Sequence, residues 1–341
     1  MMVIGMSHGE LSRYDTLLRV ERGELRVEDA SALLGLCRRQ IFRLLSRLHA
    51  AGPEGLISGK RGRPSNRRYD DDFRQRVVAI VREHYHDFGP TLAREYLAER
   101  HDIHLACETL RQLMIAAELW KDRDARRPRP YQPRYRRDCR GELIQIDGSK
   151  HWWFEDRGPQ CTLLVYIDDA TSELMQLKMV ESESTFAYME ATRAYIEQHG
   201  KPVAFYSDKH SVFRNARASA ARGDGMTHFG RALDALNIEI ICANSPQAKG
   251  RVERANATLQ DRLVKAMRLE GISSIADANA FLDSYRTRHN ERFARPAFDA
   301  RDLHRPLAPH DDLRSIMVWQ EQRTVTAALT LHYNKAMFIL E

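Results

Sequence analysis

Three carboxylates, far apart in the sequence, occupy positions that a metal-dependent active site would use. Asp147 ends the apolar run at residues 143–147, and Asp208 follows a second apolar run at residues 203–206. Glu253 lies just inside a predicted helix. Carboxylates at two strand ends and on one late helix suit a site that holds divalent metal for phosphodiester chemistry.

We expect two Mg²⁺ or Mn²⁺ ions at this site, because such ions prefer oxygen ligands and keep several waters. Two ions about 3.5–4 Å apart can activate a nucleophile and stabilise the leaving oxygen of a phosphoryl transfer. Asp147 would bridge both ions, and Asp208 and Glu253 would each hold one. Each residue alone also has an ordinary interpretation, as a turn aspartate or as a glutamate that favours a helix N-terminus.

Two further aspartates, Asp168 and Asp169, also follow an apolar run and compete for the same role. They lead directly into residues 170–172, whose sequence is typical of a hairpin turn. We therefore favour Asp147 as the first metal ligand.

Charge is divided unevenly along the 341 residues. Residues 1–140 contain 28 Lys and Arg against 20 Asp and Glu, whereas residues 141–341 contain 25 against 27. A basic front half indicates a nucleic-acid-binding region joined to a domain with another task, with a solvated Arg-rich surface as the alternative. No long apolar run and no signal-peptide pattern occurs, so we expect a cytosolic protein without a membrane partner.

The five cysteines contain no Cys-x-x-Cys pair, which argues against a zinc ribbon and against a disulfide framework. His101, His104 and Cys107 have a spacing that zinc could use, but no fourth ligand is evident. We favour surface histidines and a buried cysteine here.

The first 50 residues predict three helices, at residues 11–22, 27–34 and 37–48. The third has an apolar side and a basic side, the latter formed by Arg38, Arg39, Arg43 and Arg47. A short helix, a turn with a glycine and an arginine-faced helix are typical of a helix-turn-helix that contacts phosphates and base edges in a major groove. An ordinary helical hairpin with a solvated arginine face is the alternative.

A basic linker follows at residues 59–69. Its Arg61 and Arg63 flank a glycine and precede a proline, and they would fit the narrow minor groove of DNA. A solvated linker is the alternative.

A second helical unit at residues 70–120 predicts three more helices, at residues 71–85, 91–100 and 108–119. We interpret it as a second DNA-binding unit. Residues 121–140 are basic and rich in proline, which prevents a helix there. This segment would lie along a phosphate backbone or act as an interdomain spacer.

From residue 141 the pattern changes from helical to strand-like. Strands are predicted at residues 143–147, 161–167, 173–180, 203–206 and 238–241, and helices at residues 184–199, 229–236, 248–270 and 275–289. The order of strands and helices predicts a mixed α/β sheet, in which strand ends and loops bring catalytic side chains together. Residues 214–225 are interpreted as an inserted loop.

Residues 142–270 resemble the catalytic core of retroviral integrases and insertion-sequence transposases, the DDE family with a ribonuclease-H-like fold. The matching segments are Ile146-Asp147-Gly148, residues 166–171, Tyr206-Ser207-Asp208 and residues 245–256. The last is the most specific, because a Ser-Pro, a Gly and Glu253 introduce the family's final catalytic helix. The resemblance implies that Asp147, Asp208 and Glu253 form the metal-binding catalytic triad and that Lys249 and Arg254 contact transposon-end DNA.

Two features depart from the common family pattern. The 44 residues between Asp208 and Glu253 exceed the usual spacing, and the insertion at residues 214–225 accounts for the difference. Lys209 and His210 follow Asp208 where many members have Asn-Gly. This indicates a subgroup close to ISNCY-type transposases and leaves the role of His210 open.

The resemblance implies a DNA transposase of the bacterial cytoplasm, associated with the nucleoid. It would bind the terminal repeats of an insertion sequence, cleave the element ends with metal and join them to target DNA. Both substrates are double-stranded DNA, and two ends must be joined, so a homo-multimer is expected. The alternatives are a DNA-binding regulator and a ribonuclease-H-like nuclease that cuts without joining.

We predict a multidomain chain with an all-α helix-turn-helix region, an α/β ribonuclease-H-like core and the start of a small C-terminal β domain. The predicted boundaries are 1–58, 59–69, 70–120, 121–140, 141–290 and 291–341. Strands at residues 323–331 and 335–340 resemble the opening of a β-barrel that related transposases append. Two strands cannot form a barrel alone, so a truncation here would weaken activity.

Overall fold

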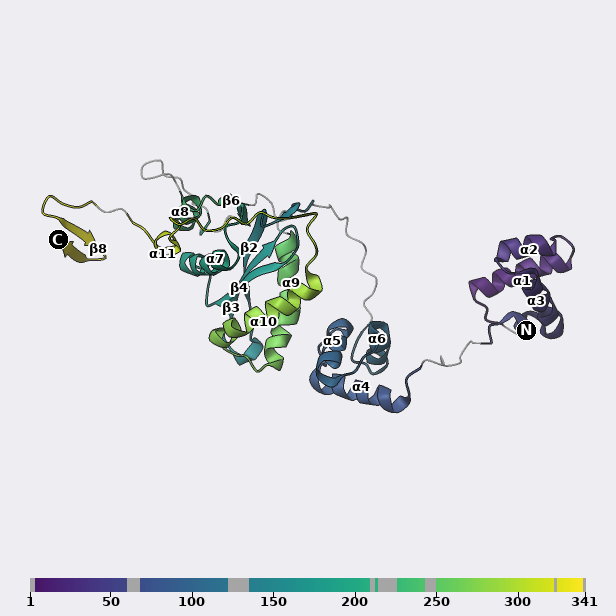
Figure 1. Cartoon of the computed structure of the whole chain (residues 1–341). Coiled ribbons are helices and arrows are strands. Elements are labelled where there is room, and N and C mark those ends of the chain that lie inside the picture. The colour runs from purple at the N-terminus through teal and green to yellow at the C-terminus, as the bar shows by residue number, and fades with distance from the viewer. Residues whose placement is uncertain are drawn as a thin grey trace. The chain divides into compact units, whose positions relative to one another are not determined.

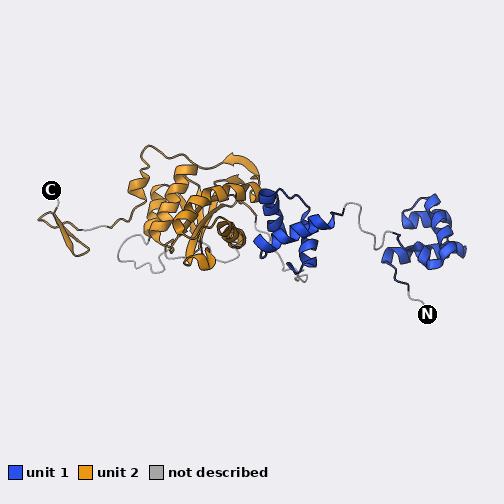
Figure 2. Ribbon diagram, turned by 90° about the horizontal axis from the view of Figure 1, so that it is seen from below, with its two compact units in different colours: residues 1–124 blue, residues 125–341 orange. Residues whose placement is uncertain are grey.

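The part of the chain that the structure describes divides into two units. The structure, a computed structural model, describes residues 4–59, 68–121, 135–208, 212–213, 226–242, 250–321 and 324–339. The units are residues 1–124, which are helical, and residues 125–341, which contain the sheet (Figure 2). No helix of the described ranges combines the length and the apolar character needed to cross a membrane.

The N-terminal helices form the predicted helix-turn-helix arrangement. They are α1 (His8–Glu21), α2 (Val27–Leu34) and α3 (Arg38–Ala51), followed by the 3₁₀ helix η1 (Gly52–Leu56). Ser7 and Glu10 cap α1 reciprocally, and Gly35 ends α2 with φ +63°, a left-handed conformation that glycine adopts readily. Leu17, Ile41 and Leu44 are buried between the helices. Apolar residues three and four apart thus place the arginines of α3 on its outer side.

The second helical unit contains α4 (Asp71–His84), α5 (Pro90–His101) and α6 (Cys107–Ala116), as predicted to within a few residues. The group considered for zinc has other partners here. His101 Nε2 lies 2.9 Å from the Tyr85 hydroxyl, and Cys107 Sγ lies 3.5 Å from Thr91 Oγ1. His104 is exposed.

The second unit is built on a mixed five-stranded sheet, as the resemblance implies. Its strands, in spatial order, are β4 (Leu174–Val180), β3 (Cys161–Asp168), β2 (Leu143–His151), β5 (Ala204–Ser207) and β6 (Glu239–Cys242). The three strands β4, β3 and β2 are antiparallel neighbours, whereas β2, β5 and β6 run parallel. Short connections join the antiparallel strands β2, β3 and β4, whereas segments that contain helices lead into the parallel strands β5 and β6.

Two separate apolar cores cover the two faces of the sheet. One joins β2 and β3 to α7 (Thr185–His199) and α8 (His228–Ala235), and the other joins β3 to α9 (Gly250–Leu269) and α10 (Ile275–Phe293) (Figure 1). Alternate side chains of a strand point to opposite faces, so Leu164 and Tyr166 enter the first core while Leu163 and Val165 enter the second. Ser184 caps α7 by accepting from the Ala187 amide, as predicted.

The strand that carries Asp147 is longer than predicted. We expected it to end at Asp147, but β2 continues to His151 and pairs with β3 from Ile144 to His151. Residues 148–151 have no apolar pattern that would predict a strand. They form one because they pair with residues 161–164 of β3. Asp147 therefore lies within β2, two residues beyond Gln145, the last residue that pairs with the shorter β5.

The segments that flank the core form elements that the sequence did not reveal. Strand β1 (Cys139–Arg140) pairs in parallel with β7 (Asp299–Asp302), and α11 (Leu313–Ile316) follows. At the C-terminal side, β8 (Thr330–Tyr333) and β9 (Ala336–Ile339) form an antiparallel hairpin. The prediction for β9 was close, but β8 begins later than the strand predicted at residues 323–331, because residues 327–329 form a turn before it.

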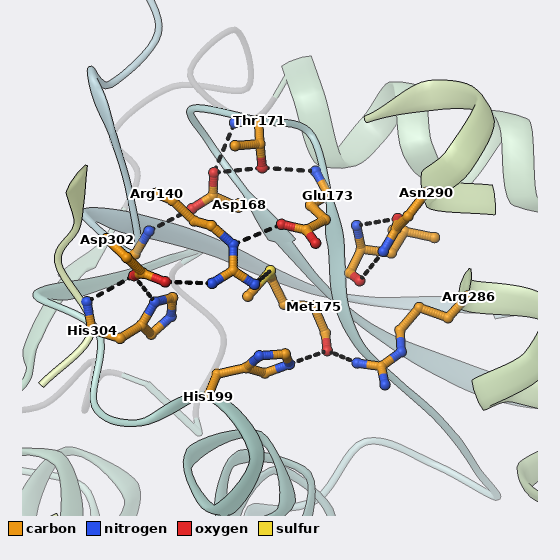
Figure 3. A network of polar contacts seen from close by, with 12 residues as sticks. Arg140, Asp168, Thr171, Glu173, Met175, His199, Arg286, Asn290, Asp302 and His304 are labelled. Carbon is orange, nitrogen blue, oxygen red and sulfur yellow. Dashed lines mark hydrogen bonds and ion pairs between the residues drawn. The ribbon is translucent and has the colours of Figure 1, made fainter. Parts of the chain in front are cut away.

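A polar network fastens β1 and β7 to the core (Figure 3). The guanidinium of Arg140 donates to Glu173 at 2.8 Å and to Asp302 at 2.6 Å, so it joins β1, the start of β4 and β7. His304 Nδ1 lies 2.5 Å from Asp302 Oδ1, which extends the network. Hydrogen bonds of this kind to charged groups are among the stronger ones in proteins.

Replacing Arg140 with alanine removes both ion pairs and leaves Glu173 and Asp302 without this partner. We expect Arg140→Ala to lower the free energy of unfolding of the core by about 2 kcal/mol. Urea unfolding of the full chain, followed by tryptophan fluorescence, measures this because Trp153 is fully buried in the core. The control is Arg193→Ala, which removes an exposed pair with Glu197 and should cost about 0.3–0.5 kcal/mol. Equal losses in the two variants would contradict the fastening role.

Candidate active site

Helix α9 lies along β2 through three regularly spaced polar contacts. The backbone amide of Val252 donates to Gln145 Oε1 at 3.3 Å. One helical turn later, Asn256 Nδ2 donates to Asp147 Oδ2 at 2.9 Å. After a further turn, Gln260 Nε2 donates to Ser149 Oγ at 3.1 Å. Four helical residues rise about 6.0 Å, and two strand residues about 6.6 Å, so helix and strand stay in step. We call these contacts the α9–β2 ladder.

The ladder and the strand register determine where the three predicted carboxylates lie. Asp147 is half-buried on β2, and Asn256 holds its Oδ2. Glu253 is exposed in the first turn of α9, one turn before Asn256 and so on a neighbouring part of the same helix surface. Asp208 directly follows β5 and is exposed.

Asp147 and Asp208 both lie just beyond the last paired residues of the parallel strands β2 and β5. The pairing of β2 with β5 matches Leu143 with Ala204 and Gln145 with Tyr206. Continued for two residues, the same register matches Asp147 with Asp208, and neighbouring strands lie about 4.8 Å apart. Both aspartates therefore lie at the same end of the β2–β5 pair.

Asp168 and Asp169, the other two candidate metal ligands, lie in the interior of the fold. Both are fully buried. Asp168 accepts from Gly141 N at 2.9 Å and from Thr171 N at 2.7 Å, and burial raises its pKa against these hydrogen bonds. Asp169 accepts from Gln145 Nε2 at 2.7 Å and forms an ion pair with Arg251. Their role is to shape the β3–β4 turn and its contact with α9.

A fourth carboxylate, Glu183, lies over Gly148, the residue after Asp147, and was missed in the sequence. A Cβ added at Gly148, the residue after Asp147, would meet the Glu183 carboxyl group at 2.3–2.7 Å. The Tyr188 hydroxyl donates to Glu183 at 2.9 Å. Burial raises the pKa of Tyr188, and the negative charges of Glu183 and Asp147 raise it further. A glycine inside a strand often marks such a close approach, and this was the available signal.

No preformed set of three His, Cys, Asp or Glu side chains that could hold a metal ion occurs among the described residues. Asp208 and Glu253 border residues 209–211 and 243–249, which are outside the described ranges. Lys249 and His210 lie in these segments.

The residues predicted to contact DNA are found on exposed surfaces where they are described. On α3, the four predicted arginines are exposed, but two have protein partners: Arg38 pairs with Glu28 at 3.2 Å, and Arg47 donates to the Ile57 carbonyl at 3.3 Å. Arg254 is exposed on α9. Arg61 and Arg63 lie outside the described residues.

Comparison with known proteins gives both sequence and structural relatives. The winged helix-turn-helix family matches residues 13–75. The chain is 54% identical over 343 residues to the protein named "Putative transposase y4bF" of Sinorhizobium fredii, covering 100% of this chain and 75% of that protein. It is 29% identical over 321 residues to the transposase for insertion sequence IS1202 of Streptococcus pneumoniae, covering 83% of this chain and 68% of that protein.

Solved structures also match this chain, among them an intasome and an integrase catalytic core. The simian T-cell lymphotropic virus intasome, in complex with the PP2A regulatory subunit B56 gamma, is 15% identical with a TM-score of 0.35, covering 60% of this chain and 65% of that chain. The HTLV-2 integrase catalytic core domain in complex with magnesium (trimeric form) is 16% identical with a TM-score of 0.32, covering 42% and 82%.

The close approach of Glu183 to Gly148 can be tested by substitution. In Gly148→Ala the new methyl group should push the Glu183 carboxylate away and break its hydrogen bond with Tyr188, at a cost of about 1–2 kcal/mol in unfolding free energy. Denaturant unfolding of the full chain measures this. Adding Glu183→Ala removes the clash, so the double variant should cost clearly less than the sum of the single variants. Additive costs would contradict the proximity of these residues.

Proposed function

Because the chain belongs to the family of insertion-sequence transposases, we propose that it cleaves DNA at the ends of a mobile element and joins those ends to target DNA. The observation that carries this proposal is the α9–β2 ladder, which holds the helix of Glu253 against the strand of Asp147. Support for Asp208 comes from its position after β5, the parallel neighbour of β2, at the same end of this strand pair as Asp147. We propose Asp147, Asp208 and Glu253 as the catalytic carboxylates.

The side chains at this edge fit a hard divalent cation such as Mg²⁺ or Mn²⁺. All three proposed ligands are carboxylates, and such ions prefer oxygen. Asn256 is buried, and its Oδ1 has no hydrogen-bond partner among the described residues, which is unusual for a buried polar atom. A pair of such ions, when bound, supplies activation of the nucleophile and stabilisation of the leaving oxygen. Asp147, Asp208 and Glu253 are the residues that would hold these ions.

The protein's own contribution is to orient these ligands. Asn256 fixes one oxygen of Asp147, so the carboxylate cannot turn freely. Gln145 accepts from the amide of Val252, directly before Glu253, and so fixes the first turn of α9. Fixed ligands lose little freedom when substrate arrives, which favours the reaction. An outer hydrogen bond to a metal ligand has this orienting effect in other proteins.

The proposed reaction has two steps of the same kind. Water attacks the phosphodiester at the element end, so that one P–O bond forms as another breaks and a 3′-hydroxyl is released. That hydroxyl then attacks a phosphodiester of target DNA, again exchanging one P–O bond for another. No covalent enzyme intermediate is required.

We propose that the N-terminal units recognise the element ends. The winged helix-turn-helix match begins within α1 and includes all of α2 and α3, and Arg39 and Arg43 are exposed on α3. Arginines on such a helix contact phosphates and base edges. Two element ends must be held together for joining, so we propose that the protein acts as a homo-multimer on double-stranded DNA.

Neutral, isosteric substitutions of the triad test the catalytic assignment. We expect Asp147→Asn, Asp208→Asn and Glu253→Gln each to reduce metal-dependent cleavage of end-sequence DNA by about 10³-fold, because each removes a charge that stabilises the bound ions. Binding of the same DNA should persist. The matched control is Asp261→Asn, on the same helix and paired with Lys265, which should cleave normally. Full cleavage by any one of the triad variants would refute its assignment, and cleavage without strand transfer by the unsubstituted protein would indicate a nuclease.

A second test concerns the residue that orients Asp147. We expect Asn256→Ala to lower the cleavage rate about 10- to 100-fold at limiting Mg²⁺ and to raise the metal concentration needed for half-maximal rate. Gln260→Ala removes the next contact of the ladder without touching an acidic side chain, so its effect should be less than about threefold. An unchanged metal requirement in Asn256→Ala would show that the hydrogen bond to Asp147 has no role in ion binding.

A further inference from the structure

A second polar site lies on α9, on the side that carries Arg251 and Arg254. It is a cavity of about 150 Å³ between α9, the C-terminal part of α10 and the β3–β4 turn. Four arginines line it, and they come from three separate stretches of the chain: Arg136, Arg251, Arg254 and Arg295. No acidic side chain is among the described residues that line the cavity.

The positive charge of the cavity is only partly compensated. Arg251 forms an ion pair with the buried Asp169. Arg136 instead donates to neutral acceptors, the carbonyl of Ala170 at 2.9 Å and the Ser172 hydroxyl at 2.8 Å. Burial lowers the pKa of Arg136, and the nearby cations of Arg251 and Arg295 lower it further. An anion in the cavity would relieve this repulsion.

A buried histidine without a complete set of hydrogen bonds also lines the cavity. His289 is 7% exposed, and its Nδ1 has no partner among the described residues. Burial lowers its pKa to about 4, so the imidazole is neutral near pH 7 and one ring nitrogen can donate a hydrogen bond. Its ring is held by Phe293, with centroids 4.5 Å apart. A buried polar atom left unpaired is costly, so His289 independently points to a ligand with polar atoms.

We propose that this cavity binds one backbone phosphate of the DNA on which the protein acts. Arginine guanidinium groups offer paired donors whose geometry matches phosphate oxygens. A neutral imidazole and the Ser172 hydroxyl add uncharged donors, as a group with several acceptor oxygens requires. Arg254 directly follows Glu253, so DNA bound here runs next to the carboxylates. The choice of DNA as the source of the phosphate rests on the proposed function.

The cavity would therefore act as a positioning site. By holding a phosphate beside α9, it would fix the DNA strand relative to Glu253 without taking part in the reaction. Arg136 precedes β1 and Arg295 follows α10, so binding would also tie the two segments that flank the core to the DNA. Phosphate contacts of this kind set the register of a protein on DNA and carry no base specificity.

The test uses the full chain carrying Asp147→Asn, so that binding is measured without cleavage. Affinity for a fluorescent DNA duplex is followed by anisotropy over a range of salt concentrations. We expect the double variant Arg254→Gln/Arg295→Gln to bind about tenfold more weakly. The slope of log affinity against log salt should become shallower by about 0.9 for each phosphate that the variant no longer neutralises. The matched control, Arg288→Gln/Arg314→Gln, removes the same charge from exposed positions that do not line the cavity.

A scan with single neutral methylphosphonate linkages then identifies the phosphate. In the protein with an intact cavity, at least one linkage should weaken binding, and that linkage should have no effect in the Arg254→Gln/Arg295→Gln variant. A control variant that binds as weakly as the cavity variant, or a scan that is identical in both proteins, would overturn the proposal. Competition by inorganic phosphate at constant ionic strength, with no linkage dependent on the two arginines, would overturn the DNA assignment. DNA cleavage is measured separately, with the protein that retains Asp147. The phosphate-binding proposal is therefore tested by DNA affinity, and the catalytic proposal by cleavage.

Discussion

The candidate site depends on one constraint: the contact residues of helix α9 and those of strand β2 are spaced equally along the two elements. The α9–β2 ladder places Val252, Asn256 and Gln260 opposite alternate residues of β2. A shift of α9 by one residue would rotate its side chains by about 100° and misalign all three contacts. The apolar residues of α9, such as Leu259 and Leu263, pack against the core but tolerate small shifts. The polar contacts select the one alignment in which Glu253 lies near the strand of Asp147.

The same sheet gives its aspartates two different roles. Asp168 ends β3 and Asp169 directly follows it. Both are fully buried, so chain amides and an arginine occupy their oxygens. Asp147 lies where β5 ends beside β2, and it therefore keeps access to solvent. Strand length, more than local sequence, separates the structural carboxylates from the proposed catalytic ones. The Arg140 network shows that flanking segments are also fixed by ion pairs between partly exposed side chains (Figure 3).

Much of the fold could be predicted because its signals are local. Helix caps such as Ser184, and apolar spacing in α3 and α9, gave the helices within a few residues. The buried run of β3 gave the central antiparallel strand. The C-terminal half of β2 could not be predicted, because its burial comes from pairing with β3. The pair of β1 and β7 joins segments on either side of the whole core, and neither strand has a periodic pattern.

The candidate site was also predictable in part, because some of its residues have local sequence signals. The sequence identified Asp147, Asp208 and Glu253 as candidates, and the fold brings their three elements together. Glu183 and the arginine cavity depend on contacts between residues far apart in the chain. Arg136 and Arg295 lie in flanking segments whose composition indicated only linkers. Such convergence follows from tertiary packing and leaves no local sequence signal.

The most direct test of the account is to locate bound metal in an experimental structure. A crystal of the protein with end-sequence DNA and Mn²⁺ would show the ions by anomalous scattering. The account predicts two peaks between the carboxylates of Asp147, Asp208 and Glu253, with Asn256 still bound to Asp147. Manganese bound elsewhere, or α9 turned so that Glu253 faces away from β2, would contradict it.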